Sequence, residues 1–505
     1  MTKNKILFWI DMWFFHFGIA KSLQKKYDCE VSAIIDVGKK ERDFFINQNF
    51  VKFHKQWFFD DYVKNLKKKP NLDYLKSIEQ KYQINIWNIA YGDKFFHPRY
   101  NQYYDFTEEE ILNLMEEECI FYEKILEDVK PDFLALLMTN NHPTQLLYEI
   151  CKNKNIKILM LIPTKFRGRF LISENEYGID KVGELNTEIL NSKTNEDLKK
   201  FWNNYNLLKH VNNFEKTHFK SHTWQRYKAI LNYFLDFGDQ SYMQRYSSFG
   251  RSKIKVLANK FNKKLKKRAI TSFLDKNLDK NISSESFVYF PLHYEPERIT
   301  LTAGRYYPDQ ITAITNIARS LPVGFKLYVK EHPAQGTLGW RDTSFYKKIM
   351  KMPNVKLLHP SVTHEEIMKN CSLVITIAGS AALEAAFFKK PTIILGEMNF
   401  PIESIQKLEK LENLPSLIRT SLSKKYDYND LNRYVELIEK NSFECDIHGM
   451  ASDFSYRFGY KGPKMESDLP NKKVESYLSD YESTFIKLAD EHFNKITQHN
   501  DFQSN

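Results

Sequence analysis

The chain has 505 residues, of which 42% are hydrophobic and 15% aromatic, with only 17 glycines and 17 prolines. This composition excludes a small disulfide-stapled scaffold, a disordered chain and a fibrous repeat. A formal net charge of +11 predicts an anionic partner, which is a phosphorylated substrate, a membrane surface or a nucleic acid.

The location of the protein follows from two features of the sequence. No uncharged apolar run is long enough to span a membrane, and the apolar start of the chain contains Asp11 and His16 without a small-residue cleavage site. The five cysteines are widely spaced without metal-type pairs, which predicts reduced, buried thiols. We therefore expect a soluble, unexported, cytoplasmic protein.

The first 175 residues alternate apolar strand patterns with helix patterns. Strands are predicted at residues 5–10, 31–35, 133–138 and 156–162. Thr107 followed by three glutamates predicts a helix N-terminus, because a threonine caps free N–H groups and acids favour the positive helix end. Continuous apolar strands between helices are typical of a parallel sheet covered on both faces. We predict an N-terminal Rossmann-like domain over residues 1–175.

Residues 176–283 are polar and helical in pattern, which predicts a basic helical insertion or linker. Within them, residues 251–280 hold eleven Lys or Arg against two Asp. Apolar side chains recur there at helical steps, at Ile254, Leu257, Phe261 and Leu265. A solvated linker helix explains this pattern, and so does an amphipathic helix on an anionic membrane surface.

A clearer alternation of strands and helices returns from residue 284. Strands are predicted at 287–290, 325–329, 355–358, 373–377 and 392–395, with helices at 308–320, 345–350, 364–370 and 380–388. We predict a second Rossmann-like domain over 284–413 and a polar helical C-terminal tail over 414–505. The fold class is therefore α/β, with two Rossmann-like domains facing a central cleft that holds a ligand at the carboxyl ends of the strands.

The loop after the strand at 373–377 has the pattern of an anion site. Gly379 makes the turn without a side chain, and Ser380 and Ala381 open a helix whose free N–H groups face outward. Glu384 lies one turn from Ser380 on the same helix face, where phosphate and ribose of one nucleotide would fit. The structural alternative is a plain N-cap with a first-turn acid.

The segment Lys330-Glu331-His332-Pro333 directly follows the strand at 325–329, and so lies at the same sheet edge as the Gly-Ser loop. The proline ends the strand and restricts the conformation of the histidine. A histidine held there could donate to a phosphate and stabilise charge on a leaving group. The alternative is a histidine that caps local backbone beside a Lys330–Glu331 ion pair.

A third loop at this edge is stiffened by Pro291 and Pro296 and carries His293 and Glu297, and Gln310 lies at the start of the next helix. Such a stiff loop suits ligand binding, although a surface turn explains it nearly as well.

Taken in order, these motifs resemble the bacterial capsule polysaccharide biosynthesis family, which includes Kdo transferases. The matching motifs lie between residues 286 and 400: Phe-Pro-Leu-His with Glu-Pro-Glu, Tyr-Pro-Asp-Gln, Val-Lys-Glu-His-Pro, and Gly-Ser followed by Glu384. The resemblance implies a GT-B-like glycosyltransferase, with the acceptor on the N-terminal domain and a nucleotide-sugar donor on the second. It also implies that His332 contacts the phosphate of a CMP donor as a catalytic group, assisted by Ser380.

The donor-binding candidates are Lys330, Glu331, Pro333, Gly379, Ser380, Ala381, Glu384, His293, Glu297 and Gln310. The candidate catalytic carboxylate is Asp11, chosen by its position after the first strand, with Glu174 and Glu176 as alternatives. His142, in a loop of the first domain, could also face the cleft. Retaining and inverting chemistry both stay open.

The predicted reaction moves an acidic sugar, Kdo or sialic-acid-like, from a CMP donor to a surface polysaccharide or lipid-linked glycan. No Asp-x-Asp triplet lies in a suitable loop, so we expect neither a metal nor a cofactor. The expected location is cytoplasmic, peripheral on the inner face of the cell membrane through residues 251–280.

Two other functions fit the sequence. The first is a UDP- or GDP-sugar transferase or an enzyme like UDP-GlcNAc 2-epimerase. The second is a non-catalytic glycan or nucleic-acid binding protein. No nucleic-acid partner is expected, because the positive charge concentrates outside the proposed cleft and no nucleic-acid module is recognised.

Overall fold

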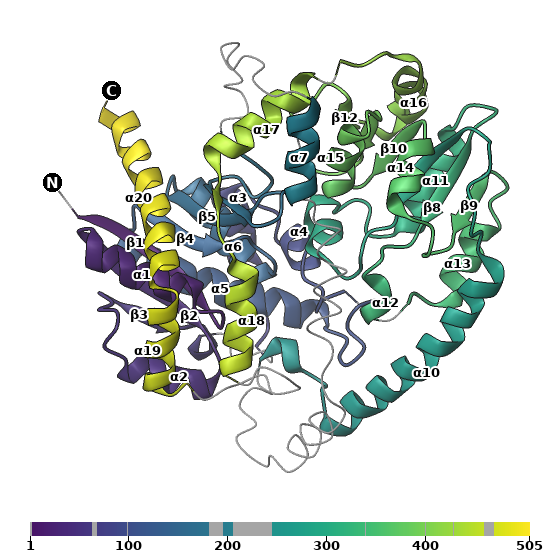
Figure 1. The fold of residues 1–505 in the computed structure, drawn as a ribbon. Helices are drawn as coiled ribbons and strands as arrows, with labels where there is room; N and C mark the ends of the chain where they lie inside the picture. Colours follow the sequence, from purple (N-terminus) through teal and green to yellow (C-terminus); the bar gives the residue numbers. More distant parts are fainter. Residues whose placement is uncertain are drawn as a thin grey trace. The chain divides into compact units, whose positions relative to one another are not determined.

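The computed structural model divides the chain into two units (Figure 1). Unit 1 comprises residues 1–176, 207–251 and 442–505, and unit 2 comprises residues 177–206 and 252–441. The residues described are 3–62, 68–97, 99–180, 195–205, 245–338, 340–398, 400–427, 429–458 and 469–504.

Unit 1 is built on a seven-stranded sheet with the order β13-β6-β5-β4-β1-β2-β3. Its strands are β1 (Asn4–Asp11), β2 (Cys29–Asp36), β3 (Gln56–Phe58), β4 (Phe133–Leu137), β5 (Lys157–Pro163), β6 (Arg169–Ser173) and β13 (Phe443–Glu444). The five strands from β5 to β3 are parallel, whereas β6 and β13 pair antiparallel at one edge. The central strands are buried on both faces, as continuous apolar runs predict.

The helices of unit 1 cover this sheet. They are α1 (Phe15–Lys26), α2 (Lys39–Asn47), α3 (Leu72–Tyr82), α4 (Ile86–Tyr91), α5 (Glu108–Val129), α6 (His142–Asn153), α18 (Ile447–Arg457), α19 (Asn471–Asp480) and α20 (Glu482–Ser504). The predicted start of α5 is confirmed: Thr107 accepts the Glu110 N–H at 3.3 Å, and the Glu110 carboxylate accepts the Thr107 N–H at 2.9 Å. This reciprocal capping box satisfies two N–H groups at the helix end.

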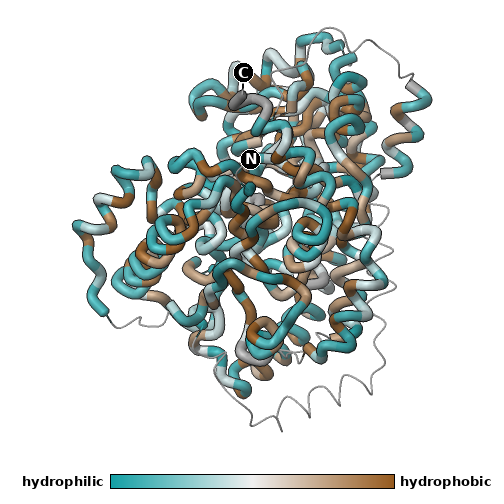
Figure 2. Tube along the Cα trace, turned by 90° about the vertical axis from the view of Figure 1, so that its left-hand side faces the viewer, coloured by the Kyte–Doolittle hydropathy of each residue, from teal (hydrophilic) through white to brown (hydrophobic). Residues whose placement is uncertain are grey.

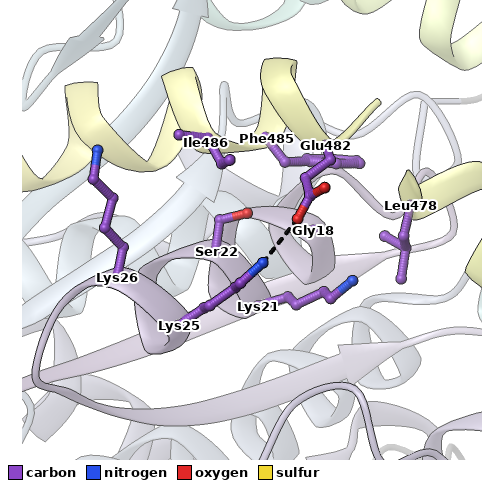
Figure 3. Close-up of a pocket in the computed structure, with 9 residues that line it drawn as sticks. All are labelled: Gly18, Lys21, Ser22, Lys25, Lys26, Leu478, Glu482, Phe485 and Ile486. Carbon is purple, nitrogen blue, oxygen red and sulfur yellow. Dashed lines mark hydrogen bonds and ion pairs between the residues drawn. The ribbon is translucent and has the colours of Figure 1, made fainter. Parts of the chain in front are cut away.

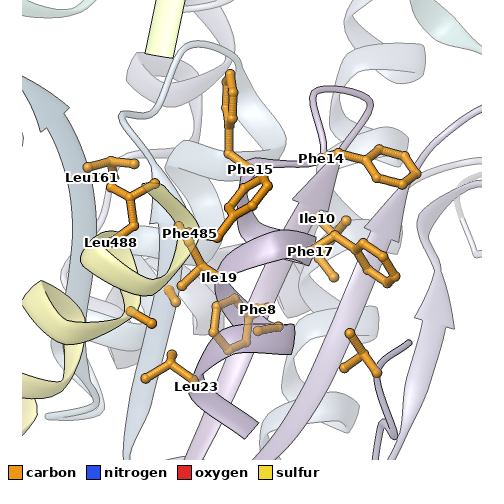
Figure 4. Packing of buried hydrophobic residues seen from close by; sticks show 14 of the residues in the cluster. Phe8, Ile10, Phe14, Phe15, Phe17, Ile19, Leu23, Leu161, Phe485 and Leu488 are labelled. Carbon is orange, nitrogen blue, oxygen red and sulfur yellow. The ribbon is translucent and has the colours of Figure 1, made fainter. Parts of the chain in front are cut away.

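The C-terminal helix α20 completes the core of unit 1. Phe485 lies among Phe8, Ile19 and other apolar side chains of α1 and the central strands (Figure 4). Gly18 permits this close approach, because a Cβ there would lie 2.2 Å from the Phe485 ring. Beside this contact, a pocket of about 190 Å³ is lined by both partners of the Lys25–Glu482 ion pair, which are 2.9 Å apart (Figure 3).

Unit 2 contains a six-stranded, fully parallel sheet with the order β12-β11-β10-β7-β8-β9. Its strands are β7 (Phe287–Pro291), β8 (Lys326–Lys330), β9 (Val355–Leu358), β10 (Leu373–Thr376), β11 (Thr392–Ile394) and β12 (Ile405–Lys407). The first five were predicted to within about one residue. The edge strand β12 was missed because its polar residues lack a strand pattern.

The helices of unit 2 connect and flank these strands. They are α7 (Asn195–Tyr205), α10 (Lys253–Asn277), α11 (Gln310–Ser320), α12 (Gln335–Leu338), α13 (Thr343–Met350), α14 (His364–Asn370), α15 (Ser380–Phe387), α16 (Leu414–Ser423) and α17 (Asn429–Asn441). The segment 414–505, predicted as one tail, is divided between the units after residue 441.

Two Rossmann-like sheets confirm the predicted α/β class, and the central cleft between them stays a prediction. Hydrophobic and hydrophilic residues alternate along the outer helices (Figure 2), as expected for helices that bury one face. Within the described residues, no helix combines the length and the hydropathy needed to cross a bilayer.

The five cysteines are buried and free of disulfides.

Candidate functional site

Three loops of unit 2 emerge from neighbouring strands at one edge of its sheet. They follow β10, β7 and β8, which are adjacent and parallel, so all three loops leave from the carboxyl ends of the strands. His293, after β7, contacts the end of β10 through its Nε2 atom, 3.1 Å from Thr376 Oγ1. The carboxyl edge of a parallel sheet is where α/β proteins bind ligands.

Lys330 is a buried cation at this edge. Only 4% of the residue is exposed, and its strand neighbours are Pro291 and Leu358. Its ammonium group has no hydrogen bond or ion pair with the residues that the structure describes. Burial lowers the pKa of Lys330 from 10.5 to about 8. A buried charge without a partner is costly, so this position favours an anionic ligand.

Glu331, the possible ion-pair partner of Lys330 in the sequence, is bound to Arg341. Glu331 is 1% exposed and forms a two-pronged ion pair with Arg341, at 2.5 and 2.6 Å. Glu331 also accepts hydrogen bonds from the Tyr346 hydroxyl at 2.9 Å and from the His332 N–H at 2.8 Å. The alternative of a Lys330–Glu331 ion pair is therefore wrong. Glu331 lies inside the protein, where it orients the loop that carries His332.

The same guanidinium joins the loops after β7 and β8. Arg341 donates to the His293 carbonyl at 2.5 Å and to the Glu295 carboxylate at 3.4 Å. Gln310, fully buried, accepts the His293 N–H at 2.8 Å and donates to Glu295 at 2.5 Å. Arg341 was missed from the sequence because no local pattern marks it, and Glu295 was noted only as the first acid of the Glu-Pro-Glu motif, without a role. Gln310 is therefore a buried residue that holds the backbone of His293 by hydrogen bonds.

His332 is a neutral hydrogen-bond donor at neutral pH. Its Nδ1 accepts the Ala334 N–H at 3.2 Å, so the ring proton is on Nε2. Burial and the nearby Arg341 charge lower the pKa of His332 from 6.5 to about 4. Its neighbour Pro333 is exposed.

The Gly-Ser loop has the geometry that its sequence indicates. Gly379 has φ +97°, which favours glycine, and α15 begins at Ser380. Ser380 and Ala381 are half-buried. Glu384 is 3% exposed, and its carboxylate lies 2.7 Å from His364 Nε2.

Glu384 is held as a carboxylate inside the protein. Burial alone would raise the pKa of Glu384, but His364, the Ser380 hydroxyl and His332 hold it below the usual value. The ribose contact predicted for Glu384 stays a prediction. Glu297, in the loop after β7, is half-buried, and its carbonyl accepts the Thr300 N–H at 3.2 Å.

In unit 1, Asp11 ends β1 at the carboxyl edge of the sheet and is partly exposed. Its Oδ1 accepts the Trp13 N–H at 3.0 Å, and its partner on the neighbouring strand is Asp36. Burial, opposed by the Trp13 hydrogen bond and aided by the charge of Asp36, raises the pKa of Asp11 from 3.8 to about 7. A carboxylate that titrates near pH 7 is suited to accept a proton in catalysis.

The other candidates of unit 1 are already paired. His142 is fully buried, with Nδ1 2.8 Å from Asp93 and Nε2 2.9 Å from Glu118. Despite burial, these carboxylates raise the pKa of His142 to about 9, so it is a structural cation and does not line a cleft. Glu176 accepts from Thr139 at 2.8 Å, and Glu174 lies 3.2 Å from His499.

Among the described residues, no group of three or more His, Cys, Asp or Glu side chains is arranged to hold a metal ion.

Comparison with known protein families gives a match to part of the chain that includes the loops of unit 2. Residues 192–419 match the family model described as capsule polysaccharide biosynthesis protein. No curated protein sequence matches the chain.

Several solved structures resemble the chain at low identity. UDP-GlcNAc 2-epimerase from Methanocaldococcus jannaschii is 14% identical, with 87% of this chain and 100% of that chain covered and a TM-score of 0.23. The same enzyme from Neisseria meningitidis is 12% identical, with 86% and 98% covered and a TM-score of 0.22. KpsC from Thermosulfurimonas dismutans, a beta Kdo 2,7 transferase, is 10% identical, with 74% and 98% covered and a TM-score of 0.29.

The matched residues contain all three loops at the carboxyl edge of unit 2, which carry the motifs of the predicted resemblance. Over residues 192–419, the chain is similar to the family of capsule polysaccharide biosynthesis proteins.

Proposed function

We propose that the protein is a glycosyltransferase of capsule polysaccharide synthesis that takes an acidic sugar from a CMP donor. The family match supports the pathway, and two Rossmann-like units in one chain are the domain content of the GT-B class. The observation that carries the proposal is Lys330, a buried cation at the ligand-binding edge without a partner among the described residues. A donor phosphate would supply the missing charge.

The donor phosphate would be held by three groups of unit 2. Lys330 supplies charge, the Nε2–H of His332 donates a hydrogen bond, and the start of α15 offers backbone N–H groups. The Ser380 hydroxyl, which donates to Glu384 in this structure, would join them by turning to the phosphate. As the sugar–phosphate bond breaks, its electron pair goes to the departing CMP. Preorganised donors stabilise this charge more in the transition state than in the bound substrate.

The acceptor hydroxyl would be activated in unit 1. Its oxygen forms the new bond to the anomeric carbon, and its proton goes to the Asp11 carboxylate. With a pKa raised to about 7, Asp11 is a stronger base than an ordinary aspartate yet still ionised above neutral pH. The acceptor is a surface polysaccharide or a lipid-linked glycan.

A thermal-shift series with CMP, CDP, UDP and GDP tests the donor class. A ligand that binds only the native state stabilises it by about 2.7 kcal/mol at a hundredfold excess over Kd. We expect a clear rise in Tm with CMP and a smaller one with UDP or GDP. A response to UDP alone would replace the CMP donor by a UDP-sugar, and salt-sensitive binding of oligonucleotides without any nucleotide response would contradict the enzyme itself.

The basic helix α10 supplies a proposed contact with the inner face of the membrane. Every residue from 260 to 269 is exposed, and the apolar side chains of Ile254, Phe261 and Leu265 are 76%, 63% and 51% exposed. Eight Lys or Arg lie between residues 253 and 268 without a single acid. Exposed apolar groups among cations match an anionic lipid surface, which attracts the charges and takes up the apolar side chains.

Co-sedimentation with vesicles checks this contact. Each lysine near an anionic surface contributes about 1 kcal/mol, so replacing Lys260, Lys263, Lys264 and Lys267 by glutamine is expected to weaken binding at least a hundredfold. Phosphatidylglycerol vesicles should bind the protein, and phosphatidylcholine vesicles should not. Val323→Ser, at another exposed apolar residue of unit 2, is the control. Unchanged binding by the four-lysine variant would exclude α10 as the contact.

A further inference from the structure

Three aspartates lie at the carboxyl ends of neighbouring strands in unit 1, and one arginine joins two of them. Asp11 ends β1, Asp36 ends β2, and Asp60 follows β3. Arg245 Nε lies 2.7 Å from Asp60, its terminal nitrogen lies 3.3 Å from Asp36, and the same nitrogen donates to the Val37 carbonyl at 2.5 Å. The arginine comes from a segment 185 residues beyond Asp60.

We propose that Arg245 is a positioning residue for proton transfer at Asp11, which it serves by neutralising Asp36 and holding Asp60. This inference rests on the proposed function of Asp11 as the base and assigns a role to a residue that no sequence motif marked.

The argument starts from the spacing of the strands. Asp11 and Asp36 are register partners on adjacent parallel strands, which lie about 5 Å apart. Register partners project to the same face of the sheet, so the two carboxylates lie beside each other and repel when both are ionised. Asp36 is the titratable group that acts on Asp11 among the described residues, and Arg245 is the cation that faces Asp36.

Without Arg245, Asp11 and Asp36 would have no cation paired with either of them among the described residues. Asp36 would then repel the ionised form of Asp11 more strongly, and Asp11 would stay protonated at neutral pH, unable to accept a proton. Asp60 responds to the same cation, since burial raises its pKa to about 6 and Arg245 opposes the rise. The neighbouring Arg42–Asp61 pair, at 2.6 Å, does not involve Asp36.

The segment around Arg245 is fixed on unit 1 by a second contact. The Tyr246 hydroxyl donates to Asp93 at 3.3 Å, and its ring centroid lies 4.8 Å from that of His142. The backbone next to Arg245 is therefore held in place, so the distance between the guanidinium and Asp36 is fixed by the fold.

The test measures the titration of Asp11 directly and does not depend on activity. Protein labelled with ¹³C at the aspartate carboxyls is titrated by NMR, with Asp11→Asn used to assign the signal. In Arg245→Ala we expect the Asp11 pKa to rise by one unit or more. In Arg245→Lys, which keeps the positive charge, we expect the Asp11 pKa to lie close to that of the wild-type protein. Arg42→Ala is the matched control, because it removes a neighbouring Arg–Asp pair and should leave Asp11 unchanged.

The rate measurement then separates the inference from the proposed function. The acid limb of the pH profile for kcat/KM should move to higher pH in Arg245→Ala, by the same amount as the NMR titration, with a loss of about tenfold one pH unit below the new midpoint. An unmoved Asp11 titration in a folded Arg245→Ala protein would overturn the inference. A moved titration with full activity of Asp11→Asn would instead overturn the role of Asp11 as base.

Discussion

Replacement of Asp11 by asparagine is expected to lower kcat by about 10²- to 10⁴-fold, the usual contribution of a general base. Asparagine keeps the size of the side chain and its hydrogen bond from the Trp13 N–H but cannot accept the acceptor proton. CMP affinity should not change, because the proposed phosphate groups belong to unit 2. Initial rates with a CMP-sugar, together with CMP titrations, measure both quantities.

The pH profile of the wild-type protein gives an independent reading of the same residue. A base must be ionised to act, so the rate should rise with pH through about 7 and then level off. Asp43→Asn, at an exposed aspartate on α2, is the control and should retain the wild-type rate. If Asp11→Asn keeps full activity while Glu176→Gln loses it, the base lies at Glu176.

Replacement of Lys330 by methionine is expected to stabilise the fold and to weaken donor binding. The pKa of Lys330, lowered from 10.5 to about 8, corresponds to a cost of about 3 kcal/mol for keeping the charge buried. Methionine fills the same space without the charge, so the free energy of unfolding at pH 7 should rise by up to this amount. CMP affinity should fall by about tenfold to a hundredfold, the usual loss for one charged hydrogen bond.

The stability gain has a pH dependence with a defined sign. Below pH 8 the folded protein carries the full cost of the charged lysine. Between pH 8 and pH 10.5 the cost disappears, because the folded side chain loses its proton before the unfolded one does. The advantage of Lys330→Met should therefore be greatest at neutral pH and vanish in alkali.

The other end of the same strand offers a matched control. Lys326 is exposed and pairs with Glu285 at 3.1 Å, so Lys326→Met should change neither CMP affinity nor the pH dependence of stability. Denaturant unfolding at several pH values and CMP titration by calorimetry give both quantities. Wild-type CMP affinity in Lys330→Met would remove this lysine from the donor site.

Local sequence was enough to predict most elements of the fold. Apolar runs marked β7 to β11 because a strand buried on both faces needs apolar residues at every position. Thr107 marked the start of α5 because a cap depends only on residues within one turn. The short strands β12 and β13 escaped prediction, since their position comes from pairing with a neighbour and not from their own residues.

The sequence by itself predicted which loops carry chemistry and showed which family the region resembles, because both depend on residue types in a local order. The partners of buried charges depend on distant segments, and only the tertiary structure decided them. It paired Glu331 with Arg341, enclosed His142 between Asp93 and Glu118, and left Lys330 without a partner among the described residues. The reason is electrostatic. A buried charge is stabilised by a counter-charge that is close in space, and that residue can be far away along the chain.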